Sequence, residues 1–360
     1  MFSTNGYLSE KAKSLTPYVA GLQPQEPGWI KLNTNESPYP PSQKVLEALK
    51  TTDISRLRLY PDGDSTALKE AIAKELDLNA ENIFCGNGSD EVLALAFQAF
   101  FSGKTNIMTP DISYGFYPVW GSMYDVGLEF RSLTDDFTLD TTHYENSNGV
   151  IIANPNAPTS LALELSQIEQ ILLQNSKRVV LVDEAYIDFA GVKSSVALLS
   201  KYENLLVVRT FSKSHSLAGM RVGYAIGHPK LIEALRLVRD SYNSYPLDML
   251  AETAAIAAIQ DRDYLKDTCK NVKAWREFTT LQLRDMGYPV FDSHTNFILI
   301  KTPEAKELYQ HLLENKILAR YWEKPRLCNV LRVSIGTKSD MEAFLTCVQE
   351  FADAKPKKHR

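Results

Sequence analysis

Short apolar runs recur along the middle of the chain and limit its fold more than any other feature. Each run is four to six residues long, rich in β-branched side chains, and has no polar residue on alternate positions. Such runs are typical of strands that are buried on both faces. Stretches with helical periodicity separate several of them, so we expect a mainly parallel α/β sheet flanked by helices. The runs are Asn82–Cys85, Thr105–Met108, Gly149–Ala153, Arg178–Val182, Asn204–Arg209 and Gly223–Ile226.

Local chemistry predicts where two of the helices begin. Ser166 and Glu169 have the spacing of a capping box, in which each side chain bonds the other residue's backbone N–H. Pro229 favours the first turn of a further helix because its ring fixes a helical φ.

The pattern changes after about Asp263. A long helix is expected over Tyr264–Met286, followed by strands at Asn296–Ile300 and Leu331–Ile335. We therefore predict a large domain over residues 50–262 and a smaller α+β domain. The N-terminal arm (1–49) is expected to join residues 263–360 in that smaller domain.

Composition excludes several classes of protein. The 360 residues carry a formal net charge of −5, which argues against nucleic-acid binding because that needs concentrated positive charge. The four cysteines are scattered without a Cys-x-x-Cys pair, so we expect neither a disulfide framework nor a metal site, and infer a reducing cytoplasm. No apolar stretch reaches the roughly 20 residues needed to span a bilayer, and Met1–Glu10 lacks the pattern of a signal peptide. The short basic tail Lys355–Arg360 is expected to be solvated.

Two polar motifs follow apolar runs. The segment Gly86–Glu91 leads into an apolar helical stretch, where free N–H groups at a helix start would bind phosphate. A simple helix cap on Ser89 or Asp90 is the alternative. Asp183 follows a strand at the position where open α/β sheets bind ligands, and it could pair with a cationic ring nitrogen or cap a helix.

A lysine motif completes the set. Lys213 ends the segment Arg209-Thr210-Phe211-Ser212-Lys213, which follows the run Asn204–Arg209 and lies among apolar residues. Burial there would lower its pKa and make the amine a nucleophile toward carbonyl groups. Most lysines are merely solvated, so the argument depends on all three motifs falling in order at strand ends.

With these motifs the chain resembles the fold-type I aminotransferases, and within them most closely the histidinol-phosphate aminotransferase family. The resemblance covers nearly the whole chain. Its motifs are Leu15–Tyr18, Leu32–Glu36, Tyr60–Pro61, Gly88–Glu91, Tyr114–Gly115, Asn154–Asn156, Asp183–Tyr186, Ser212–Lys213, Leu217–Gly223, Thr295–Asn296 and Leu331–Val333.

The resemblance implies pyridoxal 5′-phosphate (PLP) as cofactor and a role for each matching residue. Lys213 would hold the cofactor covalently, Asp183 its ring nitrogen and Tyr186 its ring hydroxyl, while Tyr114 would stack on the ring. A carboxylate beside the ring nitrogen keeps it protonated, which preserves the ring as an electron sink. The cofactor phosphate would lie among Gly88, Ser89, Asp90, Ser212 and Arg221, with Tyr60 reaching it from the partner subunit of a homodimer.

The chain departs from the family pattern at one position. The family has Asn-Asn-Pro-Thr-Gly where this chain has Asn156-Ala157-Pro158-Thr159-Ser160. The second Asn normally bonds the ring hydroxyl, so that contact is in doubt here. Either Asn156 makes this hydrogen bond through a shifted backbone, or Tyr186 alone bonds the ring hydroxyl.

The resemblance also implies the reaction. L-Histidinol phosphate would donate its amino group to 2-oxoglutarate, giving imidazole acetol phosphate and L-glutamate in histidine biosynthesis. The Arg332 fork matches phosphate and carboxylate alike. Further residues expected near the substrate are Tyr18, Asn35, Tyr245 and Arg320. For Arg320, an ordinary ion pair at the surface is the alternative.

Four other functions stay open. An aromatic aminotransferase and a threonine-phosphate decarboxylase share the scaffold. A PLP-binding regulator would carry an added DNA-binding segment, and none is apparent. A nucleotide-binding protein that used the Gly86–Gly88 loop would take no PLP, and this loop lacks the dinucleotide pattern.

Overall fold

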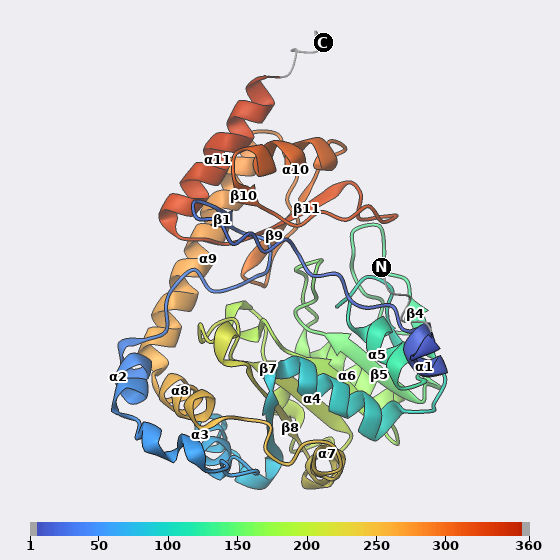
Figure 1. Ribbon diagram of the computed structural model, residues 1–360. Helices are drawn as coiled ribbons and strands as arrows, with labels where there is room; N and C mark the ends of the chain where they lie inside the picture. Colours follow the sequence, from blue (N-terminus) through green and yellow to red (C-terminus); the bar gives the residue numbers. More distant parts are fainter. Residues whose placement is uncertain (1–5, 355–360) are drawn as a thin grey trace.

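The computed structural model describes residues 6–354 and shows a large part built on one sheet, with a smaller part above it (Figure 1). The predictions for residues 1–5 and for the tail Lys355–Arg360 lie outside the described residues. The N-terminal segment, drawn in blue, runs between the two parts (Figure 1). This arrangement places residues near both ends of the sequence beside the edge of the large sheet.

The large sheet has seven strands in the order β2-β8-β7-β6-β5-β3-β4. Neighbouring strands are parallel except for β8, which is antiparallel to both β2 and β7. The expected mainly parallel sheet is therefore confirmed, with one reversed strand. The sequence did not reveal β4, because this short edge strand is only partly buried. The strands are β2 (Ile83–Asn87), β3 (Ile107–Pro110), β4 (Leu128–Arg131), β5 (Gly149–Ala153), β6 (Val180–Asp183), β7 (Leu205–Thr210) and β8 (Val222–Gly227).

Successive residues of the central strands enter two different cores. Val150 and Ile152 pack in one apolar cluster, while Ile151 lies in another on the opposite face. Burial on both faces explains why these strands read as continuous apolar runs. The helices of this part are α2 (Gln43–Thr51), α3 (Thr66–Leu76), α4 (Gly88–Ala96), α5 (Tyr117–Met123), α6 (Leu165–Gln174), α7 (Pro229–Asp240) and α8 (Met249–Gln260).

One predicted helix start is wrong and the other is right. Helix α6 is capped by Glu164, whose capping box partner is Gln167, so the box expected at Ser166 and Glu169 does not form. The helix begins one residue before Ser166, and this serine is therefore already inside the first turn. Pro229 does open α7, as expected.

The smaller part combines the C-terminal region with the N-terminal segment. Strand β1 (Ile30–Lys31) pairs in parallel with β10 (Ile317–Leu318), and β9 (Phe297–Lys301) pairs with β11 (Val330–Ser334) in antiparallel fashion. Helices α10 (Ala305–Glu314) and α11 (Lys338–Asp353) pack on them. Helix α2, which we expected in the smaller domain, packs instead on α8 of the large part. The limits of the two domains stay a prediction.

The remaining elements are short except for α9. Helix α9 (Arg262–Asp285) runs from the large part to the smaller one (Figure 1). No helix between residues 6 and 354 is long and apolar enough to cross a membrane. The short elements are α1 (Glu10–Ser14), a π-helical turn (Phe97–Phe101) and 3₁₀ turns at Ile54–Arg58, Ala80–Asn82, Ile187–Phe189, Ser195–Leu198 and Ala218–Met220.

Candidate active site

The three polar motifs meet at one edge of the large sheet. Strands β6 and β7 are parallel, so Asp183 at the end of β6 and Lys213 just after β7 lie at the same edge. Strand β2 has the same direction, since it is separated from β7 only by the reversed strand β8. The start of α4, which follows β2, therefore joins them, as the order of the motifs predicts.

Glycines leave room for an anion at the start of α4. Gly88 has a φ of +81°, and a Cβ there would lie 2.5 Å from Arg221 Nη2. A Cβ on Gly223 would lie 2.2 Å from the Ser89 backbone nitrogen. The N-cap residue Asn87 makes no side-chain cap bond, so the first N–H groups of the helix have no capping side chain. Free N–H groups and the positive helix end together attract an anion.

Side chains add further anion donors at this helix start. Arg221 donates to Ser212 Oγ at 3.4 Å and to Asp90 Oδ2 at 3.3 Å. Tyr114 donates to the other Asp90 oxygen at 2.8 Å, which fixes the tyrosine ring beside the same helix. A guanidinium, a hydroxyl and a helix start thus converge, and this donor set fits a phosphate group.

Asp183 is a buried carboxyl group without a cationic partner among residues 6–354. It accepts hydrogen bonds from the Tyr117 hydroxyl at 3.0 Å and from the Ala185 N–H at 3.1 Å. Burial raises its pKa to about 6, against the lowering effect of those two bonds. A cation placed beside it would restore the ionised form, so a protonated ring nitrogen fits this position.

Lys213 is a partly buried lysine with a lowered pKa. Burial reduces the pKa to about 8, and the positive charge of Arg332 acts in the same direction. Its Nζ donates to the Thr34 carbonyl at 3.3 Å and lies 5.9 Å from the centre of the Tyr186 ring. An amine that loses its proton near pH 8 is a competent nucleophile toward a carbonyl group.

Asn35 connects the N-terminal segment to the site. It has a left-handed φ of 56° and is almost fully buried. Its Nδ2 donates to the Tyr186 hydroxyl at 2.9 Å, and its backbone N–H donates to Ser334 Oγ at 2.9 Å. The Asn35 carbonyl accepts from Asn296 Nδ2 at 2.9 Å. The predicted residues Asn35 and Tyr186 are therefore brought together, and an atom that reaches the Tyr186 hydroxyl would meet both.

Asn156 is held within its own loop. Its Nδ2 donates to the Ile112 carbonyl at 2.9 Å and to Thr159 Oγ1 at 2.8 Å, while its Oδ1 accepts from Ser113 at 2.8 Å. None of these partners is among the expected cofactor ligands. Ala157 is buried in the same apolar cluster as Tyr186.

Two arginines of the smaller part stand directly opposite each other. The backbone N–H of Arg320 donates to the Arg332 carbonyl and the reverse bond also forms, both at 2.9 Å. Arg332 Nη2 donates to the Asn33 carbonyl at 2.8 Å, and Arg320 Nη2 donates to the Val19 carbonyl at 2.9 Å. No carboxylate between residues 6 and 354 forms an ion pair with either guanidinium. Arg320 is thus not in the surface ion pair that the sequence left open.

Tyr18 and Tyr245 each stack on another aromatic ring. Tyr18 stacks on Phe116 with ring centres 4.4 Å apart, in the segment that also carries Val19. Tyr245 stacks on Tyr60 at 4.7 Å, and 82% of Tyr60 is exposed. No contact joins Tyr60 to the phosphate-binding residues of its own chain within the described range.

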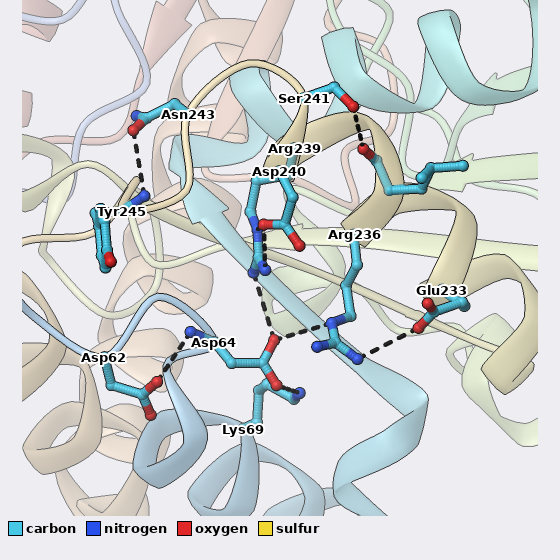
Figure 2. Close-up of polar contacts among 11 residues, drawn as sticks. Asp62, Asp64, Lys69, Glu233, Arg236, Arg239, Asp240, Ser241, Asn243 and Tyr245 are labelled. Atoms are coloured by element: carbon cyan, nitrogen blue, oxygen red, sulfur yellow. Dashed lines mark hydrogen bonds and ion pairs between the residues drawn. The ribbon is translucent and has the colours of Figure 1, made fainter.

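The loop that carries Tyr60 is fixed by one carboxylate. The Asp64 carboxylate forms ion pairs with Lys69 Nζ at 2.8 Å, Arg236 Nε at 3.1 Å and Arg239 Nη1 at 3.4 Å (Figure 2). These cations come from α3 and α7, and Lys69 and Arg239 are buried. Through these ion pairs Asp64 connects its loop to both helices.

Known proteins with similar sequences and folds identify the family. The family model for aminotransferase class I and II matches residues 27–348. Histidinol-phosphate aminotransferase of Brachyspira hyodysenteriae is 48% identical over 342 residues, which cover 94% of this chain and 97% of that protein. The same enzyme of a Marinomonas species is 48% identical over 349 residues, or 95% and 99% of the two chains. This chain belongs to the histidinol-phosphate aminotransferase family.

A solved structure of the family has the same fold. Histidinol-phosphate aminotransferase of Sinorhizobium meliloti, crystallised with pyridoxal-5′-phosphate, aligns with a TM-score of 0.82 at 24% identity. The alignment covers 90% of this chain and 91% of that one. The agreement between the two structures supports the arrangement of a large and a smaller part described above.

Two residues at the site of this histidinol-phosphate aminotransferase family member were not expected from the sequence. Tyr117 bonds Asp183, and the only available signal was its place three residues after Tyr114. Trp322 lies beside Arg320 and Arg332, and its signal was an aromatic residue two positions after an arginine. Neither signal separates a site residue from an ordinary core aromatic.

Proposed function

We propose that this chain is a PLP-dependent aminotransferase that moves the amino group of L-histidinol phosphate to 2-oxoglutarate. The observation that carries the proposal is a pair of arginines, without a carboxylate partner among residues 6–354, close to a partly buried lysine of lowered pKa. Phosphate and carboxylate groups both match an arginine fork. Membership of the family and the PLP bound in the Sinorhizobium meliloti relative support the same assignment.

Each cofactor group has a matching site in the chain. Lys213 would bind PLP covalently, and Asp183 would hold the protonated ring nitrogen. The phosphate would lie at the start of α4 with Ser212 and Arg221, whose geometry fits an anion. Tyr186, already bonded to Asn35, would meet the ring hydroxyl, and Tyr114 would support the ring face. Since Asn156 is engaged in its loop, we assign the ring hydroxyl to Tyr186 alone.

Bound PLP supplies an electron sink for the charge that forms at the substrate's α-carbon. Lys213 Nζ takes the proton from that carbon as general base and returns it as general acid. The burial that lowers the pKa of Lys213 to about 8 makes the neutral amine accessible near physiological pH. Asp183 holds a negative charge opposite the ring nitrogen during this transfer.

Arg332 and Arg320 would hold the charged end of either substrate. Histidinol phosphate has no carboxylate, so its phosphate would occupy the position that glutamate fills with a carboxylate. Tyr18 and Asn35 lie on the N-terminal segment that borders the same region. A site of this kind admits both partners of the reaction in turn.

Substrate preference tests the proposal. We expect L-histidinol phosphate to collapse the visible absorption of the PLP-loaded protein at a concentration far below that needed for L-phenylalanine. The reason is that only the phosphate ester offers two negative charges to the arginine pair. Collapse by phenylalanine at lower concentration would favour an aromatic aminotransferase, and carbon dioxide release from threonine phosphate would favour a decarboxylase. No absorption band after PLP is supplied would exclude every PLP function, including a regulator.

We also propose a cytoplasmic homodimer in which Tyr60 completes the partner's cofactor site. Tyr60 is exposed in its own chain and stacks on the exposed Tyr245. Exposed Ile54 and Leu57 extend this surface with apolar area, which is typical of an interface. The free cysteines are compatible with a reducing compartment.

Removing the Tyr60 hydroxyl tests that surface. Tyr60→Phe is expected to weaken PLP binding roughly tenfold, since it removes a hydrogen bond to a charged phosphate. Equilibrium dialysis of PLP measures the effect, and sedimentation checks that the assembly is unchanged. Tyr242→Phe removes the hydroxyl of another exposed tyrosine, serves as the matched control and should bind normally. Equal affinities for the Tyr60 variant and the control would contradict the role of Tyr60.

A further inference from the structure

Trp322 lies against both arginines of the substrate site. Its ring centre is 5.6 Å from the guanidinium carbon of Arg320 and 5.4 Å from that of Arg332. Arg332 also lies over Phe297, at 5.1 Å from the ring centre. The ring of Trp322 therefore contacts two cations whose backbones are paired across neighbouring segments.

The two arginines would repel each other without a compensating group. Like charges directly opposite on paired segments are destabilising, and no ion pair with residues 6–354 neutralises either one. Arg332 Nε is buried and has no hydrogen-bond partner in the described residues. Within residues 6–354 the guanidiniums are held by main-chain carbonyls and by aromatic rings. The negative face of an aromatic ring attracts a guanidinium, so Trp322 offsets part of the repulsion.

The ring of Trp322 is itself anchored. It packs against the apolar cluster that contains Leu327, Val330 and Leu299 in the smaller part and Phe137 in the large part. An anchored ring fixes the positions of the cations it contacts. The arrangement is therefore more than an incidental surface contact of a flexible side chain.

We propose that Trp322 is a positioning residue that holds Arg320 and Arg332 side by side, so that both guanidiniums act on one phosphate dianion. The inference rests on the proposed function and adds the residue that allows both arginines to bind the same phosphate group. A carboxylate carries one negative charge and is satisfied by one bidentate guanidinium, whereas a phosphate dianion gains from two. Trp322 thereby favours the phosphate ester over glutamate.

Replacing the ring tests the inference. In Trp322→Leu we expect the KM for histidinol phosphate to rise roughly 5- to 30-fold, the range expected for loss of a partly desolvated cation–π contact. The KM for glutamate and the kcat should change less than about twofold, since one arginine suffices for a carboxylate. Trp322→Phe keeps an aromatic face and should stay near the parent values. Calorimetry of inorganic phosphate binding to the PLP-loaded protein should show the same loss in Trp322→Leu.

The outcomes separate this inference from the proposed function. Equal increases of both KM values, or unchanged phosphate binding in Trp322→Leu, would overturn the role of Trp322. If Trp322→Leu and Trp322→Phe lose the same phosphate affinity, only the shape of the indole matters, and the role of Trp322 is likewise overturned. If the parent protein binds inorganic phosphate but does not use histidinol phosphate, the proposed function fails. Weaker phosphate binding in Trp322→Leu would in that case still support the role of Trp322 in holding both arginines on one phosphate.

A second measurement covers the case in which Trp322→Leu does not fold. Fluorinated tryptophans keep the ring shape but weaken its negative face. The chain has 4 tryptophans, so Trp322→Phe carrying the same fluorinated residues controls for the other positions. We expect phosphate affinity to fall stepwise with fluorination in the parent protein and to stay flat in Trp322→Phe. A flat series in both proteins would overturn the inference.

Discussion

Replacing Lys213 with alanine is expected to lower turnover of histidinol phosphate by at least about 10³-fold, because it removes both the covalent anchor of PLP and the general base. The variant should also show no cofactor adduct after borohydride reduction, as read by mass spectrometry. Lys201→Ala is the matched control, since Lys201 has an exposed side chain and only a 3.5 Å ion pair with Glu169. A Lys213→Ala variant with steady-state activity within tenfold of the parent would remove the basis of the assignment.

The parent protein offers a pH signature for the same lysine. Only the neutral amine attacks the PLP carbonyl, and burial lowers the pKa of Lys213 from 10.5 to about 8. The rate at which the PLP-free protein captures PLP covalently should therefore rise with pH with a midpoint near 8. An ordinary solvated lysine would place the midpoint above 10, and that result would contradict the burial argument.

Replacing Asp183 with asparagine is expected to lower kcat/KM by about 10²- to 10³-fold, the range for loss of one preorganised electrostatic contact. Asparagine retains the shape and can still accept the bond that the Tyr117 hydroxyl donates, but it carries no charge. The ring nitrogen would then lose its proton, and the ring would become a weaker electron sink. Steady-state kinetics with histidinol phosphate and 2-oxoglutarate measures the loss.

Two controls make this result specific. Borohydride trapping should show that Asp183→Asn still binds PLP at Lys213, so the loss lies in the chemistry. Asp292→Asn removes an exposed carboxylate whose partner is Arg284 and should keep full activity. If Asp183→Asn is fully loaded with PLP and as active as the Asp292 control, the carboxylate does not support the ring nitrogen.

The positions and the buried character of the central strands followed from short stretches of sequence. The runs that became β5, β6 and β7 are continuous and apolar because helices cover both faces of the sheet. Polar residues that come directly after such runs must lie at the sheet edge. Asp183 and Lys213 were placed there by this local argument, and the structure puts both at the same edge.

Other features escaped because they depend on contacts between distant residues. The reversed direction of β8 is decided by pairing with β2 and β7, and an apolar run does not encode direction. The cap of α6 moved to Glu164, since two polar residues with capping spacing compete for one helix start. The site at Asn35 needs Ser334, which is 299 residues away in sequence.

The sequence by itself determined the buried strands and the chemistry at their ends, because strand burial and the residue after a strand are local properties. Only the tertiary structure decided which distant groups meet. Arg320 and Arg332 face each other through a backbone bridge, and Trp322 reaches both across the smaller part. Such pairings depend on how the segments pack, and the spacing of residues along the chain does not specify that packing.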